Sequence, residues 1–194
     1  MIKAIIFDCF GVLVGKGFWH TYTAAGGDVR KDMQFIEDVL IRSNAGEIDD
    51  GTFNQIIADR LGMNVGEWRE RKDREEQPNL ELFRYIESDL KPHYKIGFLS
   101  NVGHGVIDRL IPSELRALFD VDIRSADVGF QKPDPRIYQL ALDRLGVSPE
   151  EAVFTDDHEE YLVGAEGLGI KTVKYNDLPT FRAKLEQILA LNLT

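Results

Sequence analysis

Five short apolar runs divide this sequence, and each leads directly into small or polar residues. They are residues 3–7 (KAIIF), 95–99 (KIGFL), 121–123 (VDI), 152–154 (AVF) and 171–173 (KTV). Near-continuous apolar runs are typical of parallel strands that are covered on both faces. From the second run onward, apolar residues at helical spacing separate the runs, as at Ile137, Leu140, Ala141 and Leu145. This alternation predicts an α/β fold built on a doubly wound parallel sheet.

The stretch between the first and second runs does not fit this alternation, because it is too long for one crossover helix. Apolar residues recur in it at helical spacing twice, around Ile36 and around Ile57, and Asp49 precedes the second group as a helix start would. We therefore expect a small helical insertion at residues 15–78 within a core made of residues 1–14 and 79–194. The charged segment 67–77 (EWRERKDREEQ) is typical of a solvated helix face.

The net charge narrows the classes of partner. A charge of −10 and a pI of about 4.9 disfavour nucleic acid and anionic membrane, but they permit a small anionic substrate at a locally positive site. Cys9 is the only cysteine, which excludes an intrachain disulfide and favours a reducing compartment. The first apolar run is too short to span a membrane and lacks a signal-peptide cleavage pattern. We expect a cytoplasmic protein, either a monomer or a homodimer.

Polar residues that can carry chemistry follow the predicted strands. Asp8 follows the first run, Ser100 and Asn101 follow the second, and Asp156 and Asp157 follow the fourth. Ligands of open parallel sheets bind at these carboxyl ends. A carboxylate there can attack phosphorus or carbon, and carboxylates from neighbouring strands can hold Mg²⁺. Each residue also has an ordinary alternative: Asp8 can end a strand, the two later aspartates can cap a helix, and Ser100 can be a turn residue.

Four segments in this order resemble the motifs of a known family. FDCFGVL around Asp8, FLSN around Ser100, GFQKPDPRIY around Lys132 and VFTDDHEE around Asp156 resemble the four motifs of the haloacid-dehalogenase superfamily. The resemblance covers the whole chain, because the helical insertion looks like the small helical cap of that superfamily. It is especially close to the subgroup that contains haloacid dehalogenases and small sugar-phosphate phosphatases.

The resemblance implies a role for each of these residues. Asp8 would be the nucleophile, with Lys132 and Ser100 as the other catalytic residues. Ser100, Asn101 and Lys132 would hold the phosphoryl group. The implied cofactor is Mg²⁺, with Asp8, the Phe10 carbonyl, Asp156 and Asp157 as its ligands. For Lys132, the alternative is a solvated loop residue.

Phe10 departs from the pattern of most phosphatases of this superfamily. They carry a second aspartate two residues after the nucleophile, and it protonates the leaving oxygen and then activates water. Losing such a group costs about 10²–10⁴ in rate. Three hypotheses compete: a phosphatase whose substrate has a good leaving group, a 2-haloacid dehalogenase with an aromatic residue at this position, or a weakly active or inactive binder of phospho-ligands.

Of these hypotheses, we expect the Mg²⁺-dependent phosphatase, acting on a small phosphorylated metabolite such as a sugar phosphate through an aspartyl-phosphate. Neither nucleic acid nor membrane is expected as a partner. His104 or His158 is a hypothetical substitute proton carrier. The aromatic residues Phe18, Trp19 and Tyr22 lie just after the first motif, and we interpret them either as packing for the insertion or as a substrate-contacting surface.

Overall fold

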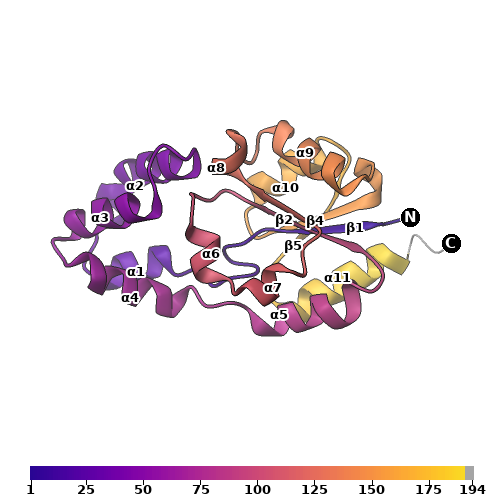
Figure 1. Cartoon of the computed structure of the whole chain (residues 1–194), viewed down its shortest axis with the longest axis horizontal. Coiled ribbons are helices and arrows are strands. Elements are labelled where there is room, and N and C mark those ends of the chain that lie inside the picture. The colour runs from indigo at the N-terminus through magenta and orange to yellow at the C-terminus, as the bar shows by residue number, and fades with distance from the viewer. Residues whose placement is uncertain (191–194) are drawn as a thin grey trace.

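A five-stranded parallel sheet lies at the centre of the computed structural model, which describes residues 1–190 (Figure 1). The order across the sheet is β3-β2-β1-β4-β5, and every neighbouring pair is parallel. Each strand coincides with one of the five apolar runs, so the predicted α/β fold is confirmed. The strands are β1 (Ala4–Phe7), β2 (Lys95–Ser100), β3 (Val121–Arg124), β4 (Ala152–Asp156) and β5 (Lys171–Lys174).

Helices cover both faces of the sheet, and the side chains of β1 alternate between two apolar clusters. Ile5 and Phe7 pack on one face, while Ala4 and Ile6 pack on the other. This period of two is that of a strand buried on both sides. The first face is covered by α5 (Leu80–Tyr85), the π-helical η1 (Ile86–Leu90), α6 (Val106–Leu110), α7 (Ser113–Arg116) and α11 (Leu178–Ala190). The second is covered by α8 (Ser125–Val128), α9 (Pro135–Leu145) and α10 (Glu159–Glu166), and the 3₁₀ turn η2 (Pro149–Glu151) precedes β4.

Four helices between β1 and α5 pack mainly on one another and lie beside the sheet (Figure 1). They are α1 (Phe18–Ala24), α2 (Val29–Asn44), α3 (Asp50–Leu61) and α4 (Val65–Glu75), and we call them the cap. Their apolar cluster is separate from those of the sheet and includes Tyr22, Ile57 and Trp68. Asp49 caps α3 by accepting a hydrogen bond from the Thr52 amide, as the sequence predicted. The division at residues 15 and 78 stays a prediction.

The two chain segments that join the cap to the core run side by side. The Gly15 amide donates to the Gln77 carbonyl at 3.1 Å, and Val14 bridges to both Phe10 and Pro78. Both connections therefore pass next to the loop that follows β1. Within residues 1–190, no helix combines the length and the apolar character needed to cross a bilayer.

The charged segment of α4 differs from the solvated face that the sequence predicted. Trp68, Lys72 and Glu76 are spaced four residues apart and share one stripe of the helix and its end, and they are only 0%, 3% and 3% exposed. Arg71 and Arg74 lie on the exposed side. The prediction was wrong for the buried stripe because charge density along a sequence does not reveal which face a neighbouring helix covers.

Candidate active site

A buried lysine joins the ends of two neighbouring strands. The Lys132 Nζ lies 2.7 Å from Asp8 Oδ1 and 2.6 Å from Asp156 Oδ2. Asp8 directly follows β1 and Asp156 ends β4, and the Asp8 amide still donates to the Thr155 carbonyl at 3.0 Å. Parallel pairing therefore presents the two carboxylates side by side, and all three charged side chains are at most 8% exposed.

Burial and mutual charge shift the pKa values of this cluster. Burial lowers the pKa of Lys132, but the charges and hydrogen bonds of Asp8 and Asp156 outweigh it, so the net shift is upward. Burial and the neighbouring Asp8 charge raise the pKa of Asp156 to about 6, against the opposing effect of Lys132. The lysine thus stays charged, while the two carboxylates repel each other unless a further cation joins them.

Asp157 adds a third carboxylate to the cluster. Oxygens of Asp8, Asp156 and Asp157 all lie within 4.8 Å of one another. The Asp157 side chain is 6% exposed, and its Oδ1 has no hydrogen-bond partner within residues 1–190. Lys132 and Lys16, which pairs with Asp157, balance two of the three carboxylates, so one excess negative charge remains on hard oxygen atoms, which are the ligands that Mg²⁺ prefers. The residues present therefore fit the implied cofactor.

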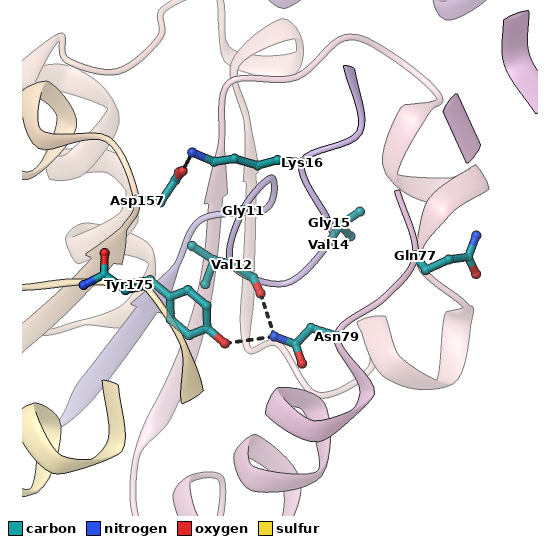
Figure 2. Close-up of a pocket in the computed structure, with 10 residues that line it drawn as sticks. Gly11, Val12, Val14, Gly15, Lys16, Gln77, Asn79, Asp157 and Tyr175 are labelled. Atoms are coloured by element: carbon teal, nitrogen blue, oxygen red, sulfur yellow. Dashed lines mark hydrogen bonds and ion pairs between the residues drawn. The ribbon is translucent and has the colours of Figure 1, made fainter. Parts of the chain in front are cut away.

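Lys16 forms an ion pair with Asp157 at the boundary between two cavities. Figure 2 shows the larger one, of about 510 Å³, with Lys16 and Asp157 facing each other at one end. At the other end, Asn79 Nδ2 donates to the Val12 carbonyl and to Tyr175 Oη. Lys16 and Asp157 thus line the larger cavity as an ion pair.

Ser100 and Asn101 lie at the carboxyl end of β2, the other neighbour of β1. The Ser100 Oγ is buried and has no hydrogen-bond partner among the described residues. Asn101 holds the Lys132 loop: its Nδ2 donates to the Lys132 carbonyl at 2.9 Å, and its Oδ1 accepts from the Lys132 amide at 2.7 Å. Asn101 thus has a positioning contact that its sequence position alone did not indicate.

A second cavity, of about 310 Å³, lies between the cap and the strand ends. The core contributes Phe10, Asn101 and His158 to its lining, which supports a site between the two parts of the chain. The cap contributes apolar and aromatic side chains together with three charged ones; these are Phe18, Trp19, Leu40, Phe53, Asp50, Lys72 and Glu76. We call this space the cap cavity.

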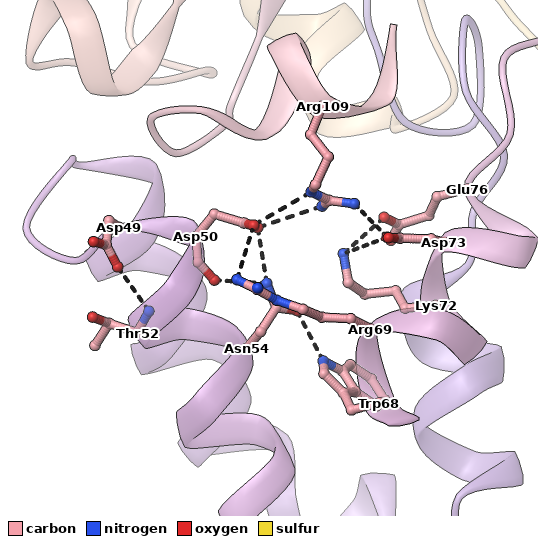
Figure 3. A network of polar contacts seen from close by, with 10 residues as sticks. All are labelled: Asp49, Asp50, Thr52, Asn54, Trp68, Arg69, Lys72, Asp73, Glu76 and Arg109. Carbon is pink, nitrogen blue, oxygen red and sulfur yellow. Dashed lines mark hydrogen bonds and ion pairs between the residues drawn. The ribbon is translucent and has the colours of Figure 1, made fainter. Parts of the chain in front are cut away.

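The sequence did not predict that two charged residues of the cap, Lys72 and Glu76, are buried. Figure 3 shows Lys72 and Glu76 at the end of α4, where Lys72 Nζ donates to Glu76 Oε2 at 2.9 Å. Both side chains are 4% exposed. The stripe begins with Trp68, whose Nε1 donates to Asn54 Oδ1 at 2.9 Å. Trp68, one helical turn before Lys72, was the apolar residue in this segment that could have indicated a buried stripe.

One protein-family model matches most of the chain and identifies its family. The model of the haloacid dehalogenase-like hydrolases matches residues 2–169. The chain belongs to this family.

Full-length relatives of this hydrolase include a phosphatase-type enzyme. Pyrophosphatase PpaX of Bacillus cereus is 27% identical over 199 residues, which cover 95% of this chain and 88% of that protein. Bifunctional epoxide hydrolase 2 of Sus scrofa is 42% identical over 80 residues, but these cover 41% of this chain and 14% of that much longer protein.

Solved structures share the fold of this hydrolase. An HAD-like family hydrolase from Porphyromonas gingivalis superposes with a TM-score of 0.73 at 27% identity, covering 95% of this chain and 98% of that one. An HAD family enzyme from Bacteroides thetaiotaomicron, in complex with magnesium and inorganic phosphate, gives a TM-score of 0.69 at 21% identity, covering 91% and 95%. The second likeness extends to the fold alone.

The two histidines proposed as proton carriers lie in different surroundings in this hydrolase. His158 lines the cap cavity, and burial lowers its pKa. Its ring stacks on Tyr161, and its amide donates to Asp156 Oδ1 at 2.8 Å. His104 is half exposed, pairs with Asp127 at 2.9 Å and is not among the residues that line either cavity. Only His158 therefore has access to the cap cavity.

Proposed function

We propose that this hydrolase is a Mg²⁺-dependent phosphatase that cleaves a small phosphorylated metabolite through an aspartyl-phosphate on Asp8. The observation that carries the proposal is the Lys132 ammonium bonded to both Asp8 and Asp156, with Asp157 beside them. Such a cluster combines a nucleophilic carboxylate, a fixed cation and a set of metal ligands at one edge of the sheet.

The proposed chemistry gives each residue one role. An oxygen of Asp8 attacks phosphorus, and the Lys132 charge offsets the repulsion between this carboxylate and the phosphate. The unpartnered Ser100 hydroxyl and the Asn101 backbone N–H hold phosphoryl oxygens, while the Asn101 side chain holds the Lys132 loop. Mg²⁺, when bound by Asp8, the Phe10 carbonyl, Asp156 and Asp157, supplies further positive charge to the phosphoryl oxygens.

Two of the similar proteins support phosphoryl chemistry over the alternatives. PpaX is a pyrophosphatase and aligns with 95% of this chain. The Bacteroides thetaiotaomicron enzyme of the same fold binds magnesium and inorganic phosphate. The three clustered carboxylates also disfavour dehalogenation, since without a metal cation their charge exceeds that of Lys132 and Lys16 and would repel the carboxylate of a haloacid.

The cap cavity limits the proposed substrate to a small metabolite. Its volume of about 310 Å³ is at the lower end of the range for small-molecule sites, about 300–1,000 Å³. Polar and aromatic side chains line it together, which suits a polar organic group such as a sugar. A cytoplasmic location and a monomeric or homodimeric state complete the proposal.

The experiment is a panel of phosphorylated metabolites and an aryl phosphate, assayed with Mg²⁺ and with EDTA. The proposal expects phosphate release that EDTA abolishes. Halide release from 2-chloropropionate that is indifferent to EDTA would instead identify a dehalogenase. A protein without either activity, but stabilised against heat by phosphate together with Mg²⁺, would be a phospho-ligand binder.

A further inference from the structure

We propose that Glu76 is the proton-transferring catalytic residue of this hydrolase, in place of the carboxylate that Phe10 lacks. The inference rests on the proposed phosphatase function and deepens it. It gives the cap a chemical role that members of the family with the second aspartate perform from the loop after the first strand.

The in-line geometry of phosphoryl transfer directs the leaving group toward the cap. The attacking and leaving oxygens lie on opposite sides of phosphorus. Asp8 attacks from the end of β1, so the leaving oxygen points away from the sheet. The cap cavity occupies that side, and both Phe10 and Glu76 line it. Under the proposed mechanism the leaving group enters this cavity, which Glu76 lines.

The other ionisable side chains that line the cap cavity have hydrogen-bond or ion-pair partners or lie beside the proposed metal ligands. Asp50 is bonded by Asn54 and lies within ion-pair distance of the Arg69 and Arg109 guanidinium groups. Lys16 is paired with Asp157, and His158 adjoins the proposed metal ligands. Among the described residues of the lining, Glu76 is the carboxyl group whose ion-pair partner, Lys72, lines the same cavity.

The surroundings of Glu76 suit a group that both donates and accepts a proton. Burial raises its pKa, and the charges of Lys72 and Arg109 partly oppose that rise while Asp73 adds to it. Lys72 and Asp73 come from α4 and Arg109 comes from α6, so both elements that face the carboxyl contribute. Backbone packing also encloses it, since a Cβ at Gly17 would lie 2.8 Å from Glu76 Cγ. The upward shift of this pKa moves the carboxyl group toward the range in which one group can both donate and accept a proton.

The proposed steps balance in protons and bonds. As the bond from Asp8 to phosphorus forms and the bond to the leaving oxygen breaks, the Glu76 carboxyl proton moves to that oxygen and an alcohol departs. The Glu76 carboxylate then takes a proton from water as the water oxygen attacks phosphorus. The bond between phosphorus and Asp8 breaks, and inorganic phosphate, the Asp8 carboxylate and protonated Glu76 remain.

The test compares Glu76→Gln with Glu75→Gln, a matched change at a neighbouring half-exposed glutamate. With an alkyl phosphate, Glu76→Gln should lower kcat by about 10²–10⁴, because the first step loses its acid. With p-nitrophenyl phosphate, whose leaving group departs as a stabilised phenolate, it should release one equivalent of nitrophenolate in a burst. The aspartyl-phosphate should then accumulate on Asp8, as seen by rapid quench and mass spectrometry. Glu75→Gln should behave like the wild type with both substrates.

A second variant separates chemistry from folding. Phe10→Asp in the Glu76→Gln background restores a carboxylate after the nucleophile, and we expect it to recover at least about tenfold of the lost kcat. If Glu76→Gln unfolds, the Lys72→Met/Glu76→Gln pair, which leaves no buried charge unpaired, takes its place. The Glu76 inference is overturned if the Glu76 variants keep the turnover of the wild type. It is also overturned if they lose turnover without a burst and without accumulation of the aspartyl-phosphate. Either result leaves the proposed phosphatase function standing. A wild type without any Mg²⁺-dependent turnover overturns the proposed function as well.

Discussion

This hydrolase contains two buried lysine–carboxylate clusters, and they are built in opposite ways. In the core, Lys132 lies between Asp8 and Asp156, with Asp157 adjacent, so carboxylates outnumber the ammonium. In the cap, Lys72 pairs with Glu76 one helical turn away. The core cluster joins segments that are far apart in sequence, whereas the cap pair is local. The comparison teaches that burial of charge alone does not define a chemical role. Excess negative charge suits a cation, whereas a single buried carboxyl group with a raised pKa suits the proton transfer that we propose for Glu76.

The largest effect should follow removal of the core lysine. Lys132→Met leaves two buried carboxylates without their shared partner, so we expect a loss of about 3–5 kcal/mol in the free energy of unfolding. We also expect kcat to fall by about 10²–10³, because a fixed positive charge at the phosphoryl group is lost. Urea denaturation and steady-state kinetics measure the two effects. Equal stability and turnover in this variant would mean that the core cluster is not what orders this site.

The cap lysine should matter less, and its effect should depend on pH. Lys72→Met leaves Glu76 buried alone, which costs about 1–3 kcal/mol at high pH. Glu76 has a folded-state pKa that is raised by burial, and loss of Lys72 raises it further. A carboxyl group with a raised folded pKa stabilises the protein below its unfolded pKa, and this contribution is lost as pH rises through the folded pKa. Denaturation at pH 5 and pH 8 should therefore show the larger loss at pH 8, and a loss that is the same at both values would contradict the account.

Metal binding should follow the protonation of Asp156. Burial and the Asp8 charge raise the pKa of this carboxyl to about 6, so below that pH a proton competes with the cation. We expect the Kd for Mg²⁺ to rise about tenfold for each pH unit below 6, as for displacement of one proton. Calorimetric titrations of the protein with Mg²⁺ between pH 5 and pH 8 test this. An affinity that does not change over this range would place the metal elsewhere.

Removal of the contact between the core and the cap should have the smallest effect on stability and activity. Arg109 of α6 pairs with Asp73 of α4 and lies 3.3 Å from Asp50 of α3, so it ties the core to the cap (Figure 3). Because the guanidinium is partly exposed, Arg109→Met should cost no more than about 1 kcal/mol in stability. We expect it to alter KM a few-fold and to leave the Kd for Mg²⁺ unchanged. The matched control is Arg74→Met, which removes an exposed arginine within α4.

The comparison also explains what the sequence could predict. The closeness of Asp8 and Asp156 could be predicted because strand ends are readable as apolar runs, and parallel pairing then brings such ends together. Lys132 was found through the family motif, because its loop has no periodic pattern. Lys72 and Glu76 were missed because their burial depends on how α4 packs against its neighbours. Local charge density does not contain that information.

The measurement that tests the central claim most directly is the site of covalent phosphorylation. The protein is mixed with Mg²⁺ and an aryl phosphate, quenched in acid within milliseconds, and its peptides are weighed by mass spectrometry. For the wild type, the account predicts a phosphoryl group on the peptide that contains Asp8. For Asp8→Asn, it predicts an intact fold with neither this adduct nor turnover. Turnover that persists in Asp8→Asn, or wild-type turnover with the phosphoryl group on another residue, would contradict it.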